Sequence, residues 1–165
     1  MIDERRTAHL LSSLRYEPET GALFWTKPGH LVRAGDRADR LAHRGRVIAA
    51  LGTAIAAHRA AYLVMTGRLP SAVIDHINGD PSDNRWSNLR EATHAENLRN
   101  RGAQRDNASG FKGVYFCDRG IRHYRAVIVL NKRKIYLGVF ATPEEAHAAY
   151  CVAAEKYHGE FARVA

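Results

Sequence analysis

The spacing of apolar positions predicts a small β-then-α unit in the first part of the chain. Apolar runs bounded by turn-forming residues predict strands over 21–29 and 46–51. From about Ala54 the apolar residues recur at helical spacing, and Gly67 and Pro70 end that pattern. A helix is therefore expected to follow the second strand.

A second module is predicted after residues 102–110, a polar, small and aperiodic segment with the composition of a linker. Alternating apolar residues predict strands over 112–117, 122–130 and 133–140, with the turns Asp118-Arg119-Gly120 and Asn131-Lys132 between them. The short turns favour a three-stranded antiparallel sheet.

One long helix is expected to cover this sheet. Thr142 has the side chain of an N-cap, a proline and two glutamates follow it, and Gly159 marks the end. The predicted buried stripe of the helix is Ala146, Ala149, Tyr150, Ala153 and Tyr157. On the middle strand the residues expected to face the helix are Tyr124, Ala126, Ile128 and Leu130. Those expected on the opposite face are His123, Arg125, Val127 and Val129.

Composition indicates a globular, basic protein of one or two small domains. The 165 residues include 25 Lys and Arg against 17 Asp and Glu, and 45% are hydrophobic. Residues 1–70 carry 11 basic and 6 acidic side chains, 71–101 carry 4 and 5, and 102–165 carry 10 and 6. Chance produces such differences too, but two polyanion-binding regions around a metal site would also explain them. Five arginines are candidates for phosphate contacts or for an ordinary polar loop: Arg33, Arg37, Arg40, Arg44 and Arg46.

Several classes are disfavoured. The most apolar stretch, 47–65, is interrupted by Gly52, His58 and Arg59, so no membrane span is expected, and no secretion signal is visible. Cys117 and Cys151 form no Cys-x-x-Cys pair and cannot supply a structural zinc site. We therefore expect a cytoplasmic protein, in a bacterial or phage-infected cell.

Residues 73–101 hold the densest cluster of Asp, His and Asn. A short strand ends in Asp75-His76, a loop rich in turn formers follows, and Thr93 with Glu96 forms a capping box that starts a helix. Asp75 and Asn97 can converge on one cation as hard oxygen donors suited to Mg²⁺ or Mn²⁺. His76 points to the other side of the strand, where it could take a proton from water.

This cluster resembles the HNH nucleases of phage and intron origin, in the branch with Asn at the third motif position. The elements present in order are Asp75-His76-Ile77-Asn78-Gly79-Asp80, Asp83-Asn84-Arg85, Asn88-Leu89-Arg90 and Glu96-Asn97. The resemblance implies that Asp75 and Asn97 bind one divalent cation, that His76 is the general base and that Asn88 braces the loop orienting it. His94 is either an assisting residue or a solvated one, and Asn78, Gly79, Asp80, Asp83 and Asn84 are expected to serve as turn residues only.

Residues 109–163 resemble the APETALA2-type DNA-binding domain. The similar segments are 109–114, 124–126, 136–140, 142–146 and 158–160. The resemblance implies major-groove contacts from the sheet face away from the helix, through Lys112, Tyr115, Arg125, Lys134 and Tyr136. It also implies phosphate contacts from Arg122, Lys132 and Arg133. Residues 111–134 hold seven basic side chains and one acidic one, with aromatic residues among them, which favours nucleic-acid binding independently.

Together these features predict an α+β protein: a ββα-metal nuclease region followed by a three-stranded antiparallel sheet with one helix. The expected domains are 1–101, a linker at 102–110, and 111–165. The expected function is a homing-type HNH endonuclease that hydrolyses double-stranded DNA, with a monomer favoured and a single-strand nick as product. Two alternatives stay open, a non-catalytic DNA-binding regulator on a degenerate HNH scaffold and an RNA-binding protein.

Overall fold

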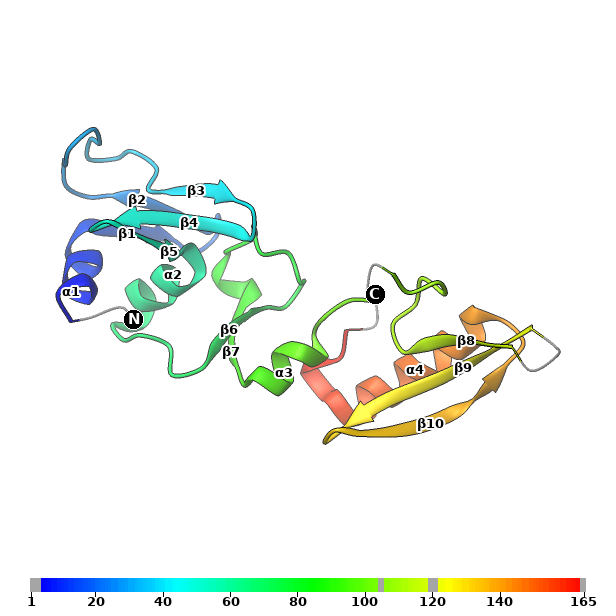
Figure 1. Cartoon of the computed structure of the whole chain (residues 1–165). Coiled ribbons are helices and arrows are strands. Elements are labelled where there is room, and N and C mark those ends of the chain that lie inside the picture. The colour runs from blue at the N-terminus through cyan, green and yellow to red at the C-terminus, as the bar shows by residue number, and fades with distance from the viewer. Residues whose placement is uncertain (1–3, 104–105, 119–121, 164–165) are drawn as a thin grey trace. The chain divides into compact units, whose positions relative to one another are not determined.

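The computed structural model describes residues 4–103, 106–118 and 122–163 of a chain of mixed helices and strands (Figure 1). The chain divides into two compact units, Met1–His94 and Ala95–Ala165. This division falls before the segment 102–110, whose role as a linker between domains stays a prediction.

The described part of the first unit contains three small antiparallel sheets and two α-helices. Its elements are α1 (Glu4–Ser13), β1 (Leu14–Glu17), β2 (Ala22–Trp25), β3 (Asp39–Ala42), β4 (Gly45–Ala50), β5 (Thr53–Ala56), α2 (Ala57–Thr66), β6 (Val73–His76), the 3₁₀ turn η1 (Trp86–Asn88) and β7 (Leu89–Ala92). Strand β1 pairs with β2, β6 pairs with β7, and β3, β4 and β5 form one sheet in that order. Helix α3 (His94–Arg99) begins at the end of this unit.

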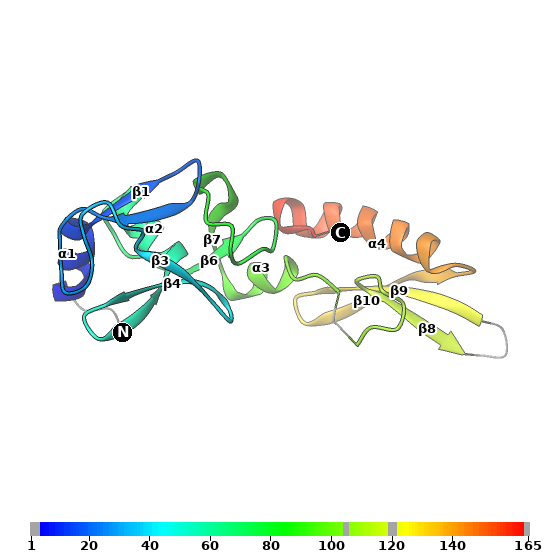
Figure 2. The same cartoon turned by 90° about the horizontal axis from the view of Figure 1, so that it is seen from above.

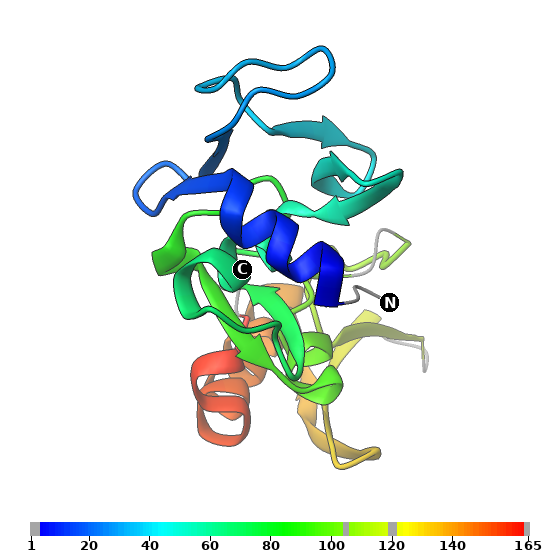
Figure 3. The same cartoon turned by 90° about the vertical axis from the view of Figure 1, so that its left-hand side faces the viewer.

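The core of the first unit lies around α2. Leu63 of α2 is fully buried together with Leu10 of α1, Leu23 of β2 and Ile48 of β4. Figure 3, which turns this unit toward the viewer, shows α1 in front of it. Helix α2 ends where expected, because Gly67 adopts a left-handed φ of 71° and its N–H bonds back to Leu63.

The strand expected at 21–29 is confirmed as the shorter β2, and the one expected at 46–51 is confirmed as β4, which begins one residue earlier. The expected helix begins at Ala57, because residues from Thr53 first complete the sheet as β5. Helix α1 and strands β1 and β3 were not predicted. Burial of Leu10, Leu14 and Tyr16 in the core supports α1 and β1 more than local sequence preference does, and β3 is held by its pairing with β4.

The second unit is a three-stranded antiparallel sheet covered by one helix, as predicted. Its elements are β8 (Val114–Asp118), β9 (Arg122–Leu130), β10 (Arg133–Phe140), α4 (Pro143–His158) and the 3₁₀ turn η2 (Gly159–Phe161). The strand order is β10-β9-β8. Figure 2 shows α4 running along one side of the sheet. The Thr142 hydroxyl accepts a hydrogen bond from the N–H of Glu145 at 3.2 Å, so the predicted N-cap is present.

Two side chains of this unit are not where the sequence placed them. Tyr157 is 38% exposed, and His158 takes the buried position at the end of α4, with Nε2 3.3 Å from the carbonyl oxygen of Val129. The helical repeat carries the stripe from Tyr150 through Ala154 to His158, one residue past the expected Tyr157. Val127 lies on the face opposite Ala126 and Ile128, as expected from the alternation, and is 5% exposed there.

Some predictions fall outside the described residues. The turn Asp118-Arg119-Gly120, positions 104–105 of the expected linker and the side chain of Arg122 are among them. Cys117 and Cys151 are not joined by a disulfide. Across the described ranges, the structure has no helix that is long and apolar enough to cross a membrane.

Candidate active site

The acidic residue of the motif lies in the two-stranded ladder of β6 and β7. Asp75 pairs in register with Arg90, whose Nε donates a hydrogen bond to Oδ2 at 3.0 Å while Nη2 lies 2.9 Å from the same oxygen. Asp75 is 4% exposed. A buried carboxylate requires such a partner, and the cross-strand arginine supplies it.

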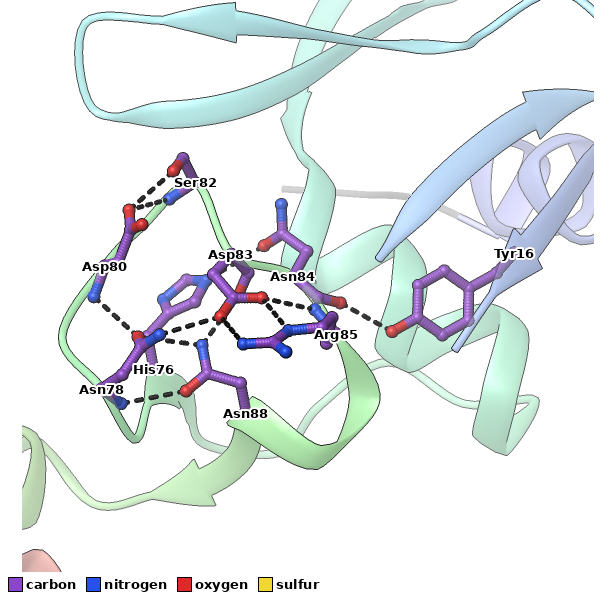
Figure 4. Close-up of polar contacts among 9 residues, drawn as sticks. All are labelled: Tyr16, His76, Asn78, Asp80, Ser82, Asp83, Asn84, Arg85 and Asn88. Atoms are coloured by element: carbon purple, nitrogen blue, oxygen red, sulfur yellow. Dashed lines mark hydrogen bonds and ion pairs between the residues drawn. The ribbon is translucent and has the colours of Figure 1, made fainter. Parts of the chain in front are cut away.

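His76 follows on the same strand and is 8% exposed. Its Nε2 lies 3.0 Å from the side-chain oxygen of Asn84, which is itself 1% exposed (Figure 4). An amide oxygen can only accept a hydrogen bond, so the neutral imidazole carries its proton on Nε2 and a lone pair on Nδ1. The contact therefore selects the tautomer in which Nδ1 is the basic nitrogen.

Asn84 is held in place by the N-terminal hairpin of β1 and β2. The Tyr16 hydroxyl donates to the carbonyl oxygen of Asn84 at 2.7 Å (Figure 4), and burial, with the nearby Asp83 and Glu19, raises the pKa of Tyr16 to about 12. Gly21 has φ +72°, and a Cβ there would lie 2.4 Å from the backbone carbon of Asn84. The hairpin packs so closely on the loop that its turn requires glycine.

Asn88 ties the two ends of the loop together. Its Nδ2 donates to the carbonyl oxygen of Asp83 at 2.7 Å and to Oδ1 of Asn78 at 3.0 Å, and its Oδ1 accepts from the Asn78 N–H at 2.9 Å (Figure 4). Hydrogen bonding by Arg85 is the main reason that the pKa of Asp83 falls to about 2, so this loop carboxylate is charged. Asn88 thus contacts the loop, while Asn84 contacts the imidazole.

A second histidine lies against His76. The rings of His58, in the first turn of α2, and His76 have centroids 5.1 Å apart and planes at 85°, an edge-to-face contact. Burial is the main cause that lowers the pKa of His58 to about 4, and the nearby His76 and Arg59 add to it. His58 is therefore neutral at pH 7.

This depressed pKa predicts a pH-dependent stability. Because His58 takes up a proton more readily in the unfolded chain, stability is lost as the pH falls from about 6.5 to about 4, by about 3 kcal/mol when fully developed. Urea unfolding followed by tryptophan fluorescence reports on the first unit alone, since Trp25 and Trp86 are the only tryptophans. His58→Phe should remove most of this pH dependence. The same loss of stability in wild type and variant would contradict the assignment.

Asp75 is the one carboxylate among the predicted ligands of a divalent cation. Among the described residues, no three His, Cys, Asp or Glu side chains cluster as a cation site. Mg²⁺ is commonly held by only one or two carboxylates together with water and substrate phosphate, and Asp75 supplies such an oxygen. Asn97 lies in the part of α3 that belongs to the second unit, so its approach to Asp75 stays a prediction. His94 is exposed at the start of α3.

The five arginines that the sequence offers as candidates for phosphate contacts divide into two groups. Arg37 and Arg46 both pair with Asp39, whose side chain is fully buried and also accepts the N–H of Leu23 at 3.0 Å. Burial opposes ionisation, but the hydrogen bonds from Arg46, Leu23 and Arg37 keep the pKa of Asp39 below its ordinary value. The remaining three, Arg33, Arg40 and Arg44, are exposed. The β3–β4 turn also packs on the loop, since a Cβ on Gly45 would lie 2.5 Å from the carbonyl oxygen of Pro81.

Four of the residues expected to contact nucleic acid lie on one face of the sheet of the second unit. Tyr115 pairs with Arg125, Tyr136 with Val127, and Lys134 with Val129, so the register places these side chains on the face opposite Ala126 and Ile128. The Arg125 guanidinium lies 5.8 Å from the centre of the Tyr115 ring, and Tyr136 is 68% exposed. Arg133 pairs with Leu130 and does not share this face, and Lys132 lies in the turn before it.

Lys112 has a different environment from the other predicted contacts. Its Nζ donates to the carbonyl oxygen of Arg99, and burial, with the positive charge of Arg163, lowers its pKa to about 8. A cavity of about 600 Å³ opens beside it within the second unit. The basic and aromatic residues that line it are Arg101, Lys112, Tyr115, Phe116 and Arg125.

The sequence interpretation missed two residues of the first-unit site. Asn84 was assigned to turn chemistry alone, and His58 was considered only as an interruption of an apolar stretch. The Asp-Asn-Arg element contains Asn84, but nothing local in the sequence indicates that its side chain reaches His76. His58 lies 18 positions before His76, and only the packing of α2 brings the two rings together.

Comparison with known proteins agrees with the motif. Residues 56–99 match the family model described as HNH endonuclease. The chain is 35% identical over 107 residues to a protein of Acanthamoeba polyphaga mimivirus named as an uncharacterized HNH endonuclease, a match that covers 64% of this chain. The chain spans about half the length of that relative, 54%. No solved structure matched the chain significantly. The similarity to HNH endonucleases is therefore located in residues 56–99.

Proposed function

We propose that the protein is a DNA endonuclease that uses His76 as its general base. The observation that carries the proposal is the contact between His76 Nε2 and the side-chain oxygen of Asn84 at 3.0 Å. It leaves the lone pair on Nδ1, which would take the proton from the attacking water. As the imidazolium forms, the hydrogen bond from its Nε2–H to the Asn84 oxygen becomes stronger and stabilises the positive charge.

Asp75 and Asn97 are the residues that would hold a divalent cation, Mg²⁺ or Mn²⁺. A cation there would supply positive charge to offset the charge that develops on the scissile phosphate and the leaving 3′ oxygen. The chain contributes the buried carboxylate of Asp75, which is paired with the Arg90 guanidinium. Strands β6 and β7 followed by α3 would then form the ββα-metal arrangement expected from the sequence.

The products would be 5′-phosphate and 3′-hydroxyl ends, as the resemblance to HNH nucleases implies. One chain offers one set of Asp75, His76 and Asn97, so a monomer would address one scissile phosphate at a time. A homing-type nickase remains our proposal for the product and the biological role.

We assign the DNA affinity largely to the second unit. Its sheet-and-helix fold and the face with Tyr115, Arg125, Lys134 and Tyr136 support an APETALA2-type role. Lys132 and Arg133 would lie near phosphates at the edge of the sheet. Lys112 is engaged with the backbone of Arg99, so we assign it a weaker contribution.

The sheet face gives a prediction that a charge count alone would not. Arg125→Ala should weaken double-stranded DNA binding and lower the slope of log affinity against log salt by about 1, because the face then loses one positive charge that displaces counterions from the DNA. Lys156→Ala removes the same charge from an exposed position on α4 and should leave the slope unchanged. Binding is measured by fluorescence anisotropy in EDTA. Equal slopes for wild type and Arg125→Ala would remove this face from the interface.

The second candidate function is a DNA-binding regulator without catalysis. The nuclease and the regulator are separated by incubating the full chain with supercoiled plasmid in Mg²⁺ or in EDTA. A nuclease converts the plasmid only in Mg²⁺, and a nickase accumulates open circles before linear DNA. Saturated binding without conversion in either Mg²⁺ or Mn²⁺ would favour the regulator.

A further inference from the structure

His58 occupies a fixed place beside the candidate base. It lies in the first turn of α2, between Ala57, which is fully buried, and the buried Ala60 and Ala61. These small residues pack into the core of the first unit, so the backbone that carries His58 is set by that core. His76 is likewise fixed by the pairing of β6 with β7. Both rings therefore project from rigid elements and not from mobile loops.

Two contacts of the His76 ring are the hydrogen bond at Nε2 and the edge-to-face contact with His58. The Asn84 oxygen fixes Nε2, but a single hydrogen bond still permits the ring to tilt about that contact. The His58 ring, 5.1 Å away at 85°, restricts that tilt by edge-to-face packing. The His58 contact therefore adds a second restraint on the orientation of the ring, in a different direction from the hydrogen bond.

We propose that His58 is a positioning residue of the nuclease site, whose ring holds the His76 imidazole in the orientation needed to deprotonate water. This inference rests on the proposed function of His76. It assigns to α2 a direct part in the site, although α2 carries none of the motif residues.

The electrostatic state of His58 suits this role. Burial is the main cause that lowers its pKa to about 4, so a neutral ring faces His76 over the whole neutral pH range. A protonated neighbour would repel the imidazolium that His76 becomes during the reaction. An aromatic ring without charge should therefore be able to replace His58.

The test uses three variants of the full chain. His58→Ala removes the ring, and His58→Phe keeps an aromatic ring without a titratable group. His30→Ala is the matched control, because it removes a histidine ring from an exposed loop position. We expect His58→Ala to lower kcat by about 10- to 100-fold with KM unchanged, because a misplaced catalytic group costs about that much. His58→Phe should stay within about threefold of wild type, and His30→Ala should be unchanged.

A second measurement needs no DNA and no turnover. Nitrogen-15 NMR of the histidine rings reports the tautomer of His76, which should be the Nε2–H form in wild type and in His58→Phe. In His58→Ala the Nε2–H signal should broaden or mix with the other tautomer. Urea unfolding of each variant separates loss of the ring contact from loss of the fold.

Three outcomes would overturn the inference. Wild-type kcat in a folded His58→Ala would make His58 an ordinary core residue. Failure of a folded His58→Phe to retain activity would show that an aromatic contact is insufficient. An unchanged His76 signal in His58→Ala would show that the ring is oriented without His58. If wild type cleaves no DNA, the proposed function fails, whereas the NMR comparison still decides whether His58 orients His76.

Discussion

Replacing His76 with alanine should lower the rate of DNA cleavage by about 10²- to 10⁴-fold, the usual contribution of a positioned general base. DNA affinity should change little, because the ring is 8% exposed and the face assigned to DNA binding lies in the second unit. The rate is measured under single-turnover conditions with protein in excess over DNA.

The structural cost of His76→Ala must be measured beside its rate. The substitution leaves the buried Asn84 oxygen without its partner, a loss of about 1–3 kcal/mol in unfolding free energy. Cleavage is therefore compared at a temperature where unfolding curves show both proteins folded. His30→Ala is the matched control, since His30 is an exposed histidine in a loop outside the motif. Cleavage by folded His76→Ala at the wild-type rate would remove it as the base.

Replacing Asp75 should have two separable effects. Asp75→Ala leaves the Arg90 guanidinium, with a side chain only 13% exposed, without its carboxylate partner. Breaking such a pair destabilises by about 3–5 kcal/mol. If Asp75 also binds the cation, Mn²⁺ binding measured by calorimetry and metal-dependent cleavage should both be lost.

The double variant Asp75→Ala/Arg90→Met separates these roles. It removes both charges and places an apolar side chain of similar length at position 90, so most of the lost unfolding free energy should return. We expect Mn²⁺ binding and cleavage to stay absent in this stable protein. Recovery of Mn²⁺ binding and cleavage together with stability would show that Asp75 serves the fold alone.

Local sequence predicted the elements whose signals are local. The N-cap at Thr142, the glycine after α2 and the alternation along β8–β10 depend on neighbours a few residues apart, and all are present. The strand, loop, strand and helix at 73–99 followed from turn formers and a short apolar pair. Residue roles within that motif came from resemblance and stay predictions until tested.

Long-range contacts were the part that the sequence could not supply. Tyr16 reaches the Asn84 carbonyl across 68 positions, and Asp39 gathers arginines from both sides of a hairpin. His58 and Asn84 meet His76 only once α2, β6 and the loop are packed. The spacing of residues along the sequence does not predict such contacts, because each depends on how separate elements pack.

The most direct test of the account is the release of new DNA ends from supercoiled plasmid in Mg²⁺, counted in parallel for wild type and His76→Ala. The account predicts 5′-phosphate and 3′-hydroxyl ends from wild type, open circles before linear DNA, and at least about 100-fold fewer ends from the variant. Ends released equally by both proteins would contradict His76 as the base. No ends from wild type on saturated DNA would contradict the nuclease itself.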